Sequence, residues 1–235
     1  MATAWAEVVS AAMVQIDDIR LQDQLAAAPA QFYRRMAALI QQAQPLMARP
    51  PELIAYLKTG AVAPTWLDAE WTSTQESKNQ QTVLDLGAVG YDLCSVVQVV
   101  TVSGAAEYVP YPAATYDKEN GTVTFPIQDA AGVEYVIDFY TDGQFPDLTA
   151  TQMRLFALAV AVVWDERFSR TWLNMQPTIH DDSYTKVNEA NYTEKITKRL
   201  HDNRISFNDE LRAYEQACAY ENTMHNSYIQ HTTLI

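Results

Sequence analysis

The chain has 235 residues, of which 48% are hydrophobic, so it can build the core of one large domain or two small ones. Its 29 acidic and 16 basic residues give a formal net charge of −13, which argues against binding nucleic acid by neutralising phosphates. No segment approaches the roughly 20 apolar residues of a membrane-spanning helix, and the first residues lack the basic and apolar pattern of a signal peptide.

Residues 1–78 are predicted to form an N-terminal helical region. Apolar side chains recur at steps of three and four over residues 3–27, which predicts one helix with a single apolar face. A second helix follows Pro29 and stops before Arg49-Pro50-Pro51, and a short third helix lies near residues 52–58. Two of these amphipathic faces are expected to pack on each other.

Residues 79–146 are predicted to form an antiparallel β region of four or five strands. Ser95–Val102 is rich in β-branched residues, and Tyr116–Phe125 reads as a hairpin whose Asn120-Gly121 pair supplies the turn. In residues 133–140 every second side chain is apolar, which is typical of a half-buried strand. The edges of this sheet need a cover from the helices or from another chain.

Residues 147–225 are predicted to return to helix and to pack with the N-terminal helices. Thr149 and Gln152 have the spacing of a capping box, and the run from Met153 to Trp164 has one charge, Arg154, so this helix is expected to be central. An aromatic ridge continues the helix at four-residue spacing and is interpreted as core or as a subunit contact: Trp164, Phe168 and Trp172.

A charged segment, residues 184–224, then reads as one long helix or as two with a break near Asn203. Apolar residues alternate at steps of four and three along it, a heptad-like seam that packs either against the central helix or against a neighbouring subunit. The possible subunit contacts on this seam are Leu200, Phe207, Leu211 and Tyr214.

The last ten residues, 226–235, alternate in side-chain character with a period of two. We expect an extended C-terminal arm that docks on a partner by adding to a sheet edge or by lying in a groove. The docking residues are Ser227, Tyr228, Ile229, Thr232, Leu234 and Ile235. The predicted fold is therefore α+β: a helical bundle with a small antiparallel β-sheet inserted between the N-terminal and C-terminal helices, followed by the arm.

Motifs for catalysis, metals and cofactors are absent from the sequence. There is no nucleophile elbow, no phosphate-binding glycine loop and no histidine pair with zinc spacing. His180-Asp181-Asp182 reads as a loop and helix cap, and Asp138 and Asp142 read as a polar strand end. Cys94 and Cys218 read as small core residues, and the sequence leaves open whether they lie close together. We therefore expect a non-enzymatic protein without a metal or cofactor.

The order of elements over roughly residues 80–225 resembles that of head-to-tail connector proteins of tailed bacteriophages, also called adaptors or neck proteins. The resemblance is carried by Val136–Phe145, which leads through Leu148-Thr149 into the apolar helix with Trp164, and then by the long helix and tail. Compact adaptors have less β structure than this chain, and its N-terminal helices have no clear counterpart in them.

The resemblance implies a structural virion protein, assembled in the host cytoplasm, that forms a ring of about twelve copies at the head–tail junction. It implies docking on the portal and on tail or neck proteins, with DNA passing nearby without specific binding. An alternative is a soluble bacterial binding or regulatory protein with a small β recognition domain, which a pocket lined by Tyr135, Tyr140 and Trp164 would favour.

Overall fold

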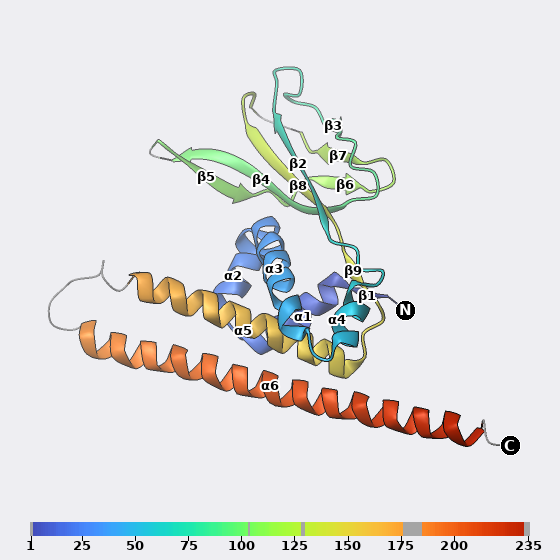
Figure 1. The fold of residues 1–235 in the computed structure, drawn as a ribbon. Coiled ribbons are helices and arrows are strands. Elements are labelled where there is room, and N and C mark those ends of the chain that lie inside the picture. The colour runs from blue at the N-terminus through green and yellow to red at the C-terminus, as the bar shows by residue number, and fades with distance from the viewer. Residues whose placement is uncertain (1, 103, 128–129, 176–184, 233–235) are drawn as a thin grey trace. The chain divides into compact units, whose positions relative to one another are not determined.

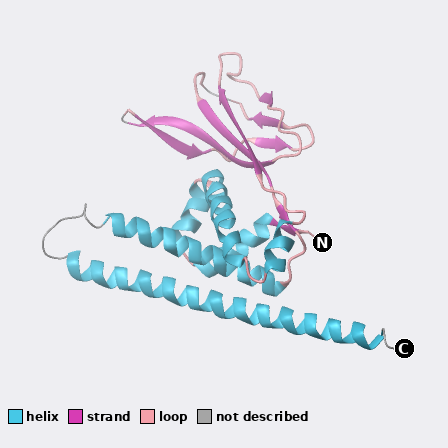
Figure 2. Ribbon diagram, in the orientation of Figure 1, coloured by secondary structure: helices cyan, strands magenta, loops and turns pink. Residues whose placement is uncertain are grey.

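The computed structural model describes residues 2–102, 104–127, 130–175 and 185–232, without the side chains of 20, 170–175, 185–193, 196, 222 and 224–232. The chain divides into two compact units. The helical unit comprises Met1–Asp17, Ala37–Ala61 and Phe145–Ile235, and the sheet unit comprises Asp18–Met36 and Val62–Gln144. Helices and antiparallel sheets are both extensive (Figure 2), which confirms the α+β class.

The helical unit is built around α5 (Ala150–Met175), which packs against α1 (Trp5–Ile16) and against α6 (Thr185–Thr232). All residues from Leu155 to Trp164 are buried, as their nearly uncharged sequence predicts for a helix with neighbours on several sides. The predicted capping box starts α5: Gln152 N donates to Thr149 Oγ1 at 3.3 Å, and Thr149 N donates to Gln152 Oε1 at 2.9 Å.

The N-terminal helices differ from the prediction at one point. A single helix was expected over residues 3–27, but Asp17 has a left-handed backbone with φ of 44° and ends α1, and α2 (Ile19–Ala27) starts anew. Short elements follow: α3 (Pro29–Ala43), the 3-10 turn η1 (Gln44–Met47) and α4 (Pro51–Lys58). The first half of α3 clusters with the sheet unit and the second half with the helical unit.

Two antiparallel sheets form the sheet unit, with strand orders β2-β8-β4-β5 and β3-β7-β6. The four-stranded sheet contains β2 (Thr65–Thr72), β8 (Glu134–Thr141), β4 (Asp92–Val102) and β5 (Ala105–Pro110). The three-stranded sheet contains β3 (Thr82–Asp85), β7 (Thr122–Phe125) and β6 (Thr115–Asp117). The short strand β1 (Thr3–Ala4) pairs with β9 (Gln144–Phe145). After β9 the chain returns to helix.

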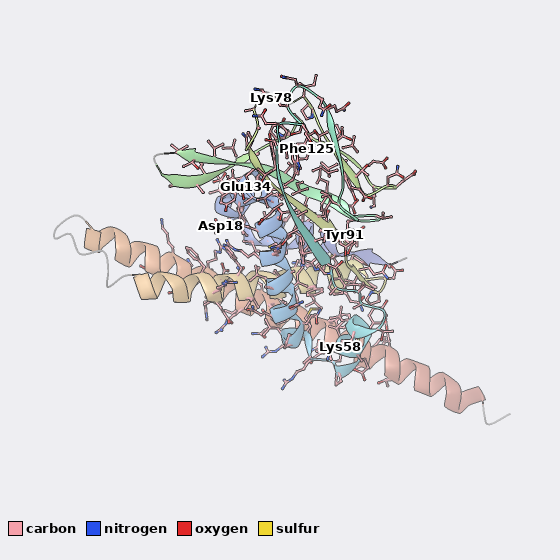
Figure 3. The ribbon with its side chains drawn as sticks, turned by 90° about the horizontal axis from the view of Figure 1, so that it is seen from above. Asp18, Lys58, Lys78, Tyr91, Phe125 and Glu134 are labelled. Atoms are coloured by element: carbon pink, nitrogen blue, oxygen red, sulfur yellow. The ribbon has the colours of Figure 1, made fainter. Side chains whose placement is uncertain are left out.

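The core of the sheet unit is aromatic and includes the side chains on the inward face of β8. Tyr135, Ile137 and Phe139 are almost completely buried, which confirms the predicted alternation of this strand. Phe125 lies among them, 4.8 Å from Tyr135 between ring centroids, and its side chain is labelled in Figure 3. Trp71 of β2 stacks on Tyr135 at 5.4 Å. Interlocked rings of this kind bury much apolar surface and fix one packing arrangement.

The predicted Asn120-Gly121 hairpin joins β6 to β7. Gly121 has φ of +67°, and a Cβ added there would lie 2.6 Å from Val89 N, so the position requires glycine for its backbone and for its space. The β region begins earlier than residue 79, because β2 was not predicted. The long C-terminal helix is continuous and has no break near Asn203.

Candidate interaction surfaces

Polar contacts hold α5 and α6 side by side in antiparallel order (Figure 1), since residue numbers rise along one helix as they fall along the other. These contacts, with donor–acceptor distances, are Gln152–Tyr214 at 2.9 Å, Arg154–Glu210 at 2.7 Å, Asp165–Arg199 at 2.5 Å, Asp165–Asn203 at 2.6 Å and Glu166–Arg204 at 2.5 Å.

Asp165 is the buried member of this set, with 2% of its surface exposed. Arg199 donates to Oδ1 and Asn203 donates to Oδ2, so both carboxylate oxygens accept a hydrogen bond. A carboxylate out of water is tolerated only when it is paired in this way. The Arg204–Glu166 pair is more exposed, with 55% and 28% of the side chains accessible, and contributes much less to stability.

The predicted subunit contacts divide into covered and partly open residues. Phe207 and Leu211 are 5% and 8% exposed within the single chain, so their surface is already covered, and the seam serves packing inside the subunit. Trp164 is 7% exposed and stacks on the half-buried Phe168 at 6.5 Å. Leu200 and Tyr214 are half-buried, and the side chain of Trp172 lies outside the described residues.

The C-terminal arm was predicted to be extended, and this prediction is wrong for residues 226–232. The backbone of Ser227, Tyr228, Ile229 and Thr232 belongs to α6, because the helix runs without interruption to Thr232. The side chains of these four residues, and the whole of Leu234 and Ile235, lie outside the described residues. A docking role for this segment would therefore use a helix face.

The distal segment of α6, residues 215–232, continues past the start of α5. The last described polar contact between the two helices is the hydrogen bond from Gln152 to Tyr214, near the first turn of α5, and α6 continues to Thr232. At 1.5 Å per residue, the stretch after Tyr214 is about 27 Å long. Tyr220, on this stretch, is 66% exposed. Glu215 and Cys218, at the start of this stretch, are half-buried, and an isolated helix of this length is only marginally stable in water, so we expect the stretch to have a partner.

A polar cluster lies on the face of the four-stranded sheet that the first half of α3 covers. Asp68 on β2 and Asp138 on β8 stand opposite each other in register. Arg34 of α3 forms an ion pair with Asp68 and lies 3.8 Å from Asp138, which also accepts a hydrogen bond of 2.7 Å from Ser95. The guanidinium of Arg34 also lies over the Trp66 ring at 5.4 Å.

These contacts attach the first half of α3 to the sheet and were not foreseen as a group. Tyr33 of α3 stacks on Tyr140 at 5.3 Å, which in turn stacks on Trp66 at 5.9 Å. The signal in the sequence is the alternation of β2, in which Trp66, Asp68 and Glu70 share one face. Both faces of β2 carry aromatic residues, because the sheet is covered on both sides. The strand therefore lacks a simple alternation of apolar and polar residues and was not predicted.

Burial raises the pKa of Asp138, and the neighbouring charge of Asp68 raises it further. The hydrogen bond from Ser95 and the charge of Arg34 lower this pKa but do not cancel the rise. The folded pKa thus lies above the unfolded value of about 3.9. Protonation of Asp138 therefore stabilises the folded state. This stabilisation is complete at pH values below the unfolded pKa and is lost as pH rises through the folded pKa. We expect Asp138→Asn to unfold like the wild type below pH 4 and to be more stable than the wild type at pH 7 in urea titrations.

Asp117 provides a control of opposite sign. Hydrogen bonds from Asn120 lower the pKa of the Asp117 carboxylate, which is exposed. Its stabilisation is present above the unfolded pKa and is lost as pH falls through the folded pKa. Asp117→Asn should therefore be less stable than the wild type at pH 7 and approach it in acid. Equal signs for the two variants would contradict the assignment.

Cys94 sits at a β-bulge in β4 and lines an open pocket of about 270 Å³ in the sheet unit. Small apolar residues form much of its wall: Ala26, Ala27, Pro29, Val97, Pro110 and Pro112. Burial, followed by the charge of Asp138, raises the pKa of Cys94 to about 12. The thiol is therefore neutral at physiological pH and is a poor nucleophile.

Slow alkylation is the expected consequence for Cys94. At pH 8 in iodoacetamide, mass spectrometry of the Cys94 peptide should show a rate about 100-fold lower in folded protein than in urea-unfolded protein, because the thiolate fraction is much smaller. Rates within threefold of each other would show that the thiol is not held in its neutral form.

The pocket proposed for the alternative function does not form around the expected residues. Tyr135 points into the core, whereas Tyr140 lies on the opposite face of β8 and stacks on Tyr33. Trp164 belongs to the helical unit. In the described part of the chain, no three histidine, cysteine or acidic side chains are grouped as a metal site, and no helix is long and apolar enough to cross a membrane.

No protein-family model matches the chain, and no curated protein matches its sequence.

Proposed function

We propose that the chain is a non-enzymatic structural virion protein, a ring-forming head-to-tail connector of a tailed phage that docks on the portal. The observation that carries the proposal is the distal segment of α6, residues 215–232, which continues about 27 Å beyond its last described polar contact with α5. A helix that leaves its own subunit in this way has a face available for a neighbouring chain.

The rest of the helical unit supports a role as a rigid mount. The proximal part of α6 is fixed to α5 by five polar contacts and by the covered residues Phe207 and Leu211. Rigid attachment at one end lowers the entropy that the free end loses when it binds. A helix mounted in this way suits a subunit that must hold a fixed position in a ring.

The charge of the chain is compatible with a place beside a DNA channel. A net charge of −13 repels the phosphate backbone, so DNA would pass without adhering. Acidic surfaces are also common in proteins with other roles. The charge therefore supports the proposal less strongly than α6 does.

Binding to the portal tests the proposal directly. The purified full-length chain is mixed with the portal ring of the phage whose genome encodes it, and the mixture is separated on a density gradient. We expect the chain to sediment with the portal ring and not with an unrelated phage's portal. A chain that remains at the top of the gradient at micromolar concentrations would contradict docking.

The pocket beside Cys94 favours the second candidate, a soluble protein with a β recognition domain. Its volume of about 270 Å³ is slightly below the usual range for small-molecule sites, and its wall is largely apolar. A monomer that binds a small apolar molecule there, with an affinity reduced by Val97→Trp, would support this candidate over the connector.

A further inference from the structure

The strand β5 forms a free edge of the four-stranded sheet. Within the described residues it pairs only with β4, through the register from Val97–Pro110 to Val102–Ala105. All six of its residues are exposed, including Tyr108 at 63% and Val109 at 40%. An exposed strand edge that is unpaired can receive another strand, and folded proteins normally cover such edges or place charges on them, as Glu107 does here.

The surface beside this edge is apolar and continuous across the sheet. In the register, Tyr108 on β5 stands opposite Val99 on β4, which stands opposite Glu134 on β8. The next row pairs Val97 with Val136. Residues directly opposite in antiparallel strands point to the same side, so this face combines valine and tyrosine side chains with a glutamate at its border.

Acidic residues outnumber basic residues in the sheet unit. The segment Val62–Gln144 contains twelve acidic and two basic residues, of which Lys118 is paired with Asp92, and Asp18–Met36 adds two acidic and three basic residues. Glu107 lies on β5 itself, and Glu134 is exposed at the start of β8 (Figure 3). A partner that covers the edge must therefore bring positive charge to this rim.

A second copy of the chain does not meet this requirement. Strand β5 of another copy contains Glu107 and no lysine or arginine, so pairing of β5 with β5 brings no positive charge to the edge. Pairing of β5 with the other free edge, β2, would bring Glu107 toward Asp68 and Glu70. Like charges on neighbouring strands are destabilising, and nucleic acid is excluded for the same reason.

We propose that β5 receives an extended, basic segment of a different protein, which adds to the sheet as a fifth strand. Backbone hydrogen bonds to β5 supply affinity, apolar side chains of the segment cover Tyr108 and Val99 on one face, and its lysine or arginine residues pair with Glu107 on the other face. This site belongs to the sheet unit, and its test is independent of α6.

A synthetic peptide of alternating lysine and valine serves as the probe, with a glutamate–valine peptide for comparison. Titration calorimetry with the full-length chain should show binding of the lysine peptide only. Glu107→Lys should weaken that binding at least tenfold, whereas the matched control Glu119→Lys, an equal charge change on the exposed turn between β6 and β7, should weaken it less than threefold.

Backbone amide shifts measured by NMR locate the peptide. The largest changes are expected at Ala106, Tyr108 and Val109. Three results would overturn the proposal: no binding of the lysine peptide, equal binding of the glutamate peptide, or an equal loss for Glu107→Lys and Glu119→Lys. Circular dichroism confirms that both variants, which alter exposed side chains, remain folded.

Discussion

A chain that ends at Ala219 is expected to stay folded and to lose its assembly with other subunits. The described polar contacts between α5 and α6 end at Tyr214, so the truncation removes none of these contacts. It removes the distal helix that we propose as the docking surface. The association constant measured by sedimentation velocity should fall at least 100-fold, while the midpoint of thermal unfolding changes by only a few degrees.

Point variants on the same helix separate docking from a general change of surface charge. Tyr220, 66% exposed, lies on the distal segment, and Ile205, 46% exposed, lies on the preceding part of α6, which is packed against α5. Tyr220→Asp should weaken assembly about tenfold or more, and Ile205→Asp should leave it within threefold. If the Ala219 truncation assembles like the full-length chain, the part of α6 after Ala219 has no part in docking.

Arg199→Ala is expected to destabilise the helical unit by about 2–4 kcal/mol, because it leaves the buried carboxylate of Asp165 without its positive partner. Asn203 alone cannot compensate for that charge. The matched control is Arg204→Ala, which removes the same side chain from the same helix. Its partner Glu166 can return to water, so the cost should be less than about 1 kcal/mol.

Urea unfolding followed by circular dichroism measures both free energies. A loss of less than 1 kcal/mol for Arg199→Ala, or equal losses for the two variants, would mean that the Asp165 contact does not anchor α6. Double substitution Asp165→Leu with Arg199→Leu should recover much of the stability, because it removes the buried charge together with its partner.

The sequence was most informative where one local rule decided the structure. The Thr149–Gln152 capping box, the alternation in β8 and the turn at Asn120-Gly121 each depend on neighbours within a few residues, and each is confirmed. The uniformly apolar run from Leu155 to Trp164 likewise predicted a helix with neighbours on several sides.

Errors arose where tertiary context or chain continuity decided the structure. The apolar stripe of α1 continues in sequence through Asp17, yet a single left-handed residue ends the helix there. Residues 226–232 alternate like a strand, but adding one residue to an existing helix gains a hydrogen bond at little cost, so α6 continues.

The candidate site illustrates the same limit. The heptad-like pattern identified Phe207 and Leu211 as residues that need a partner, and they have one. Periodicity cannot distinguish a partner within the chain from one in another subunit, because both bury the same apolar face. The Arg34–Asp68–Asp138 cluster joins residues far apart in sequence and has no local signature.

The mass of the purified full-length protein in solution tests the central claim, that α6 of one subunit completes its packing on another chain. Native mass spectrometry should show a closed assembly of about twelve copies of the 26.4 kDa chain, and the Ala219 truncation should be a monomer. A full-length chain that remains monomeric at every concentration, with residues 215–232 protected from hydrogen exchange by its own fold, would contradict the account.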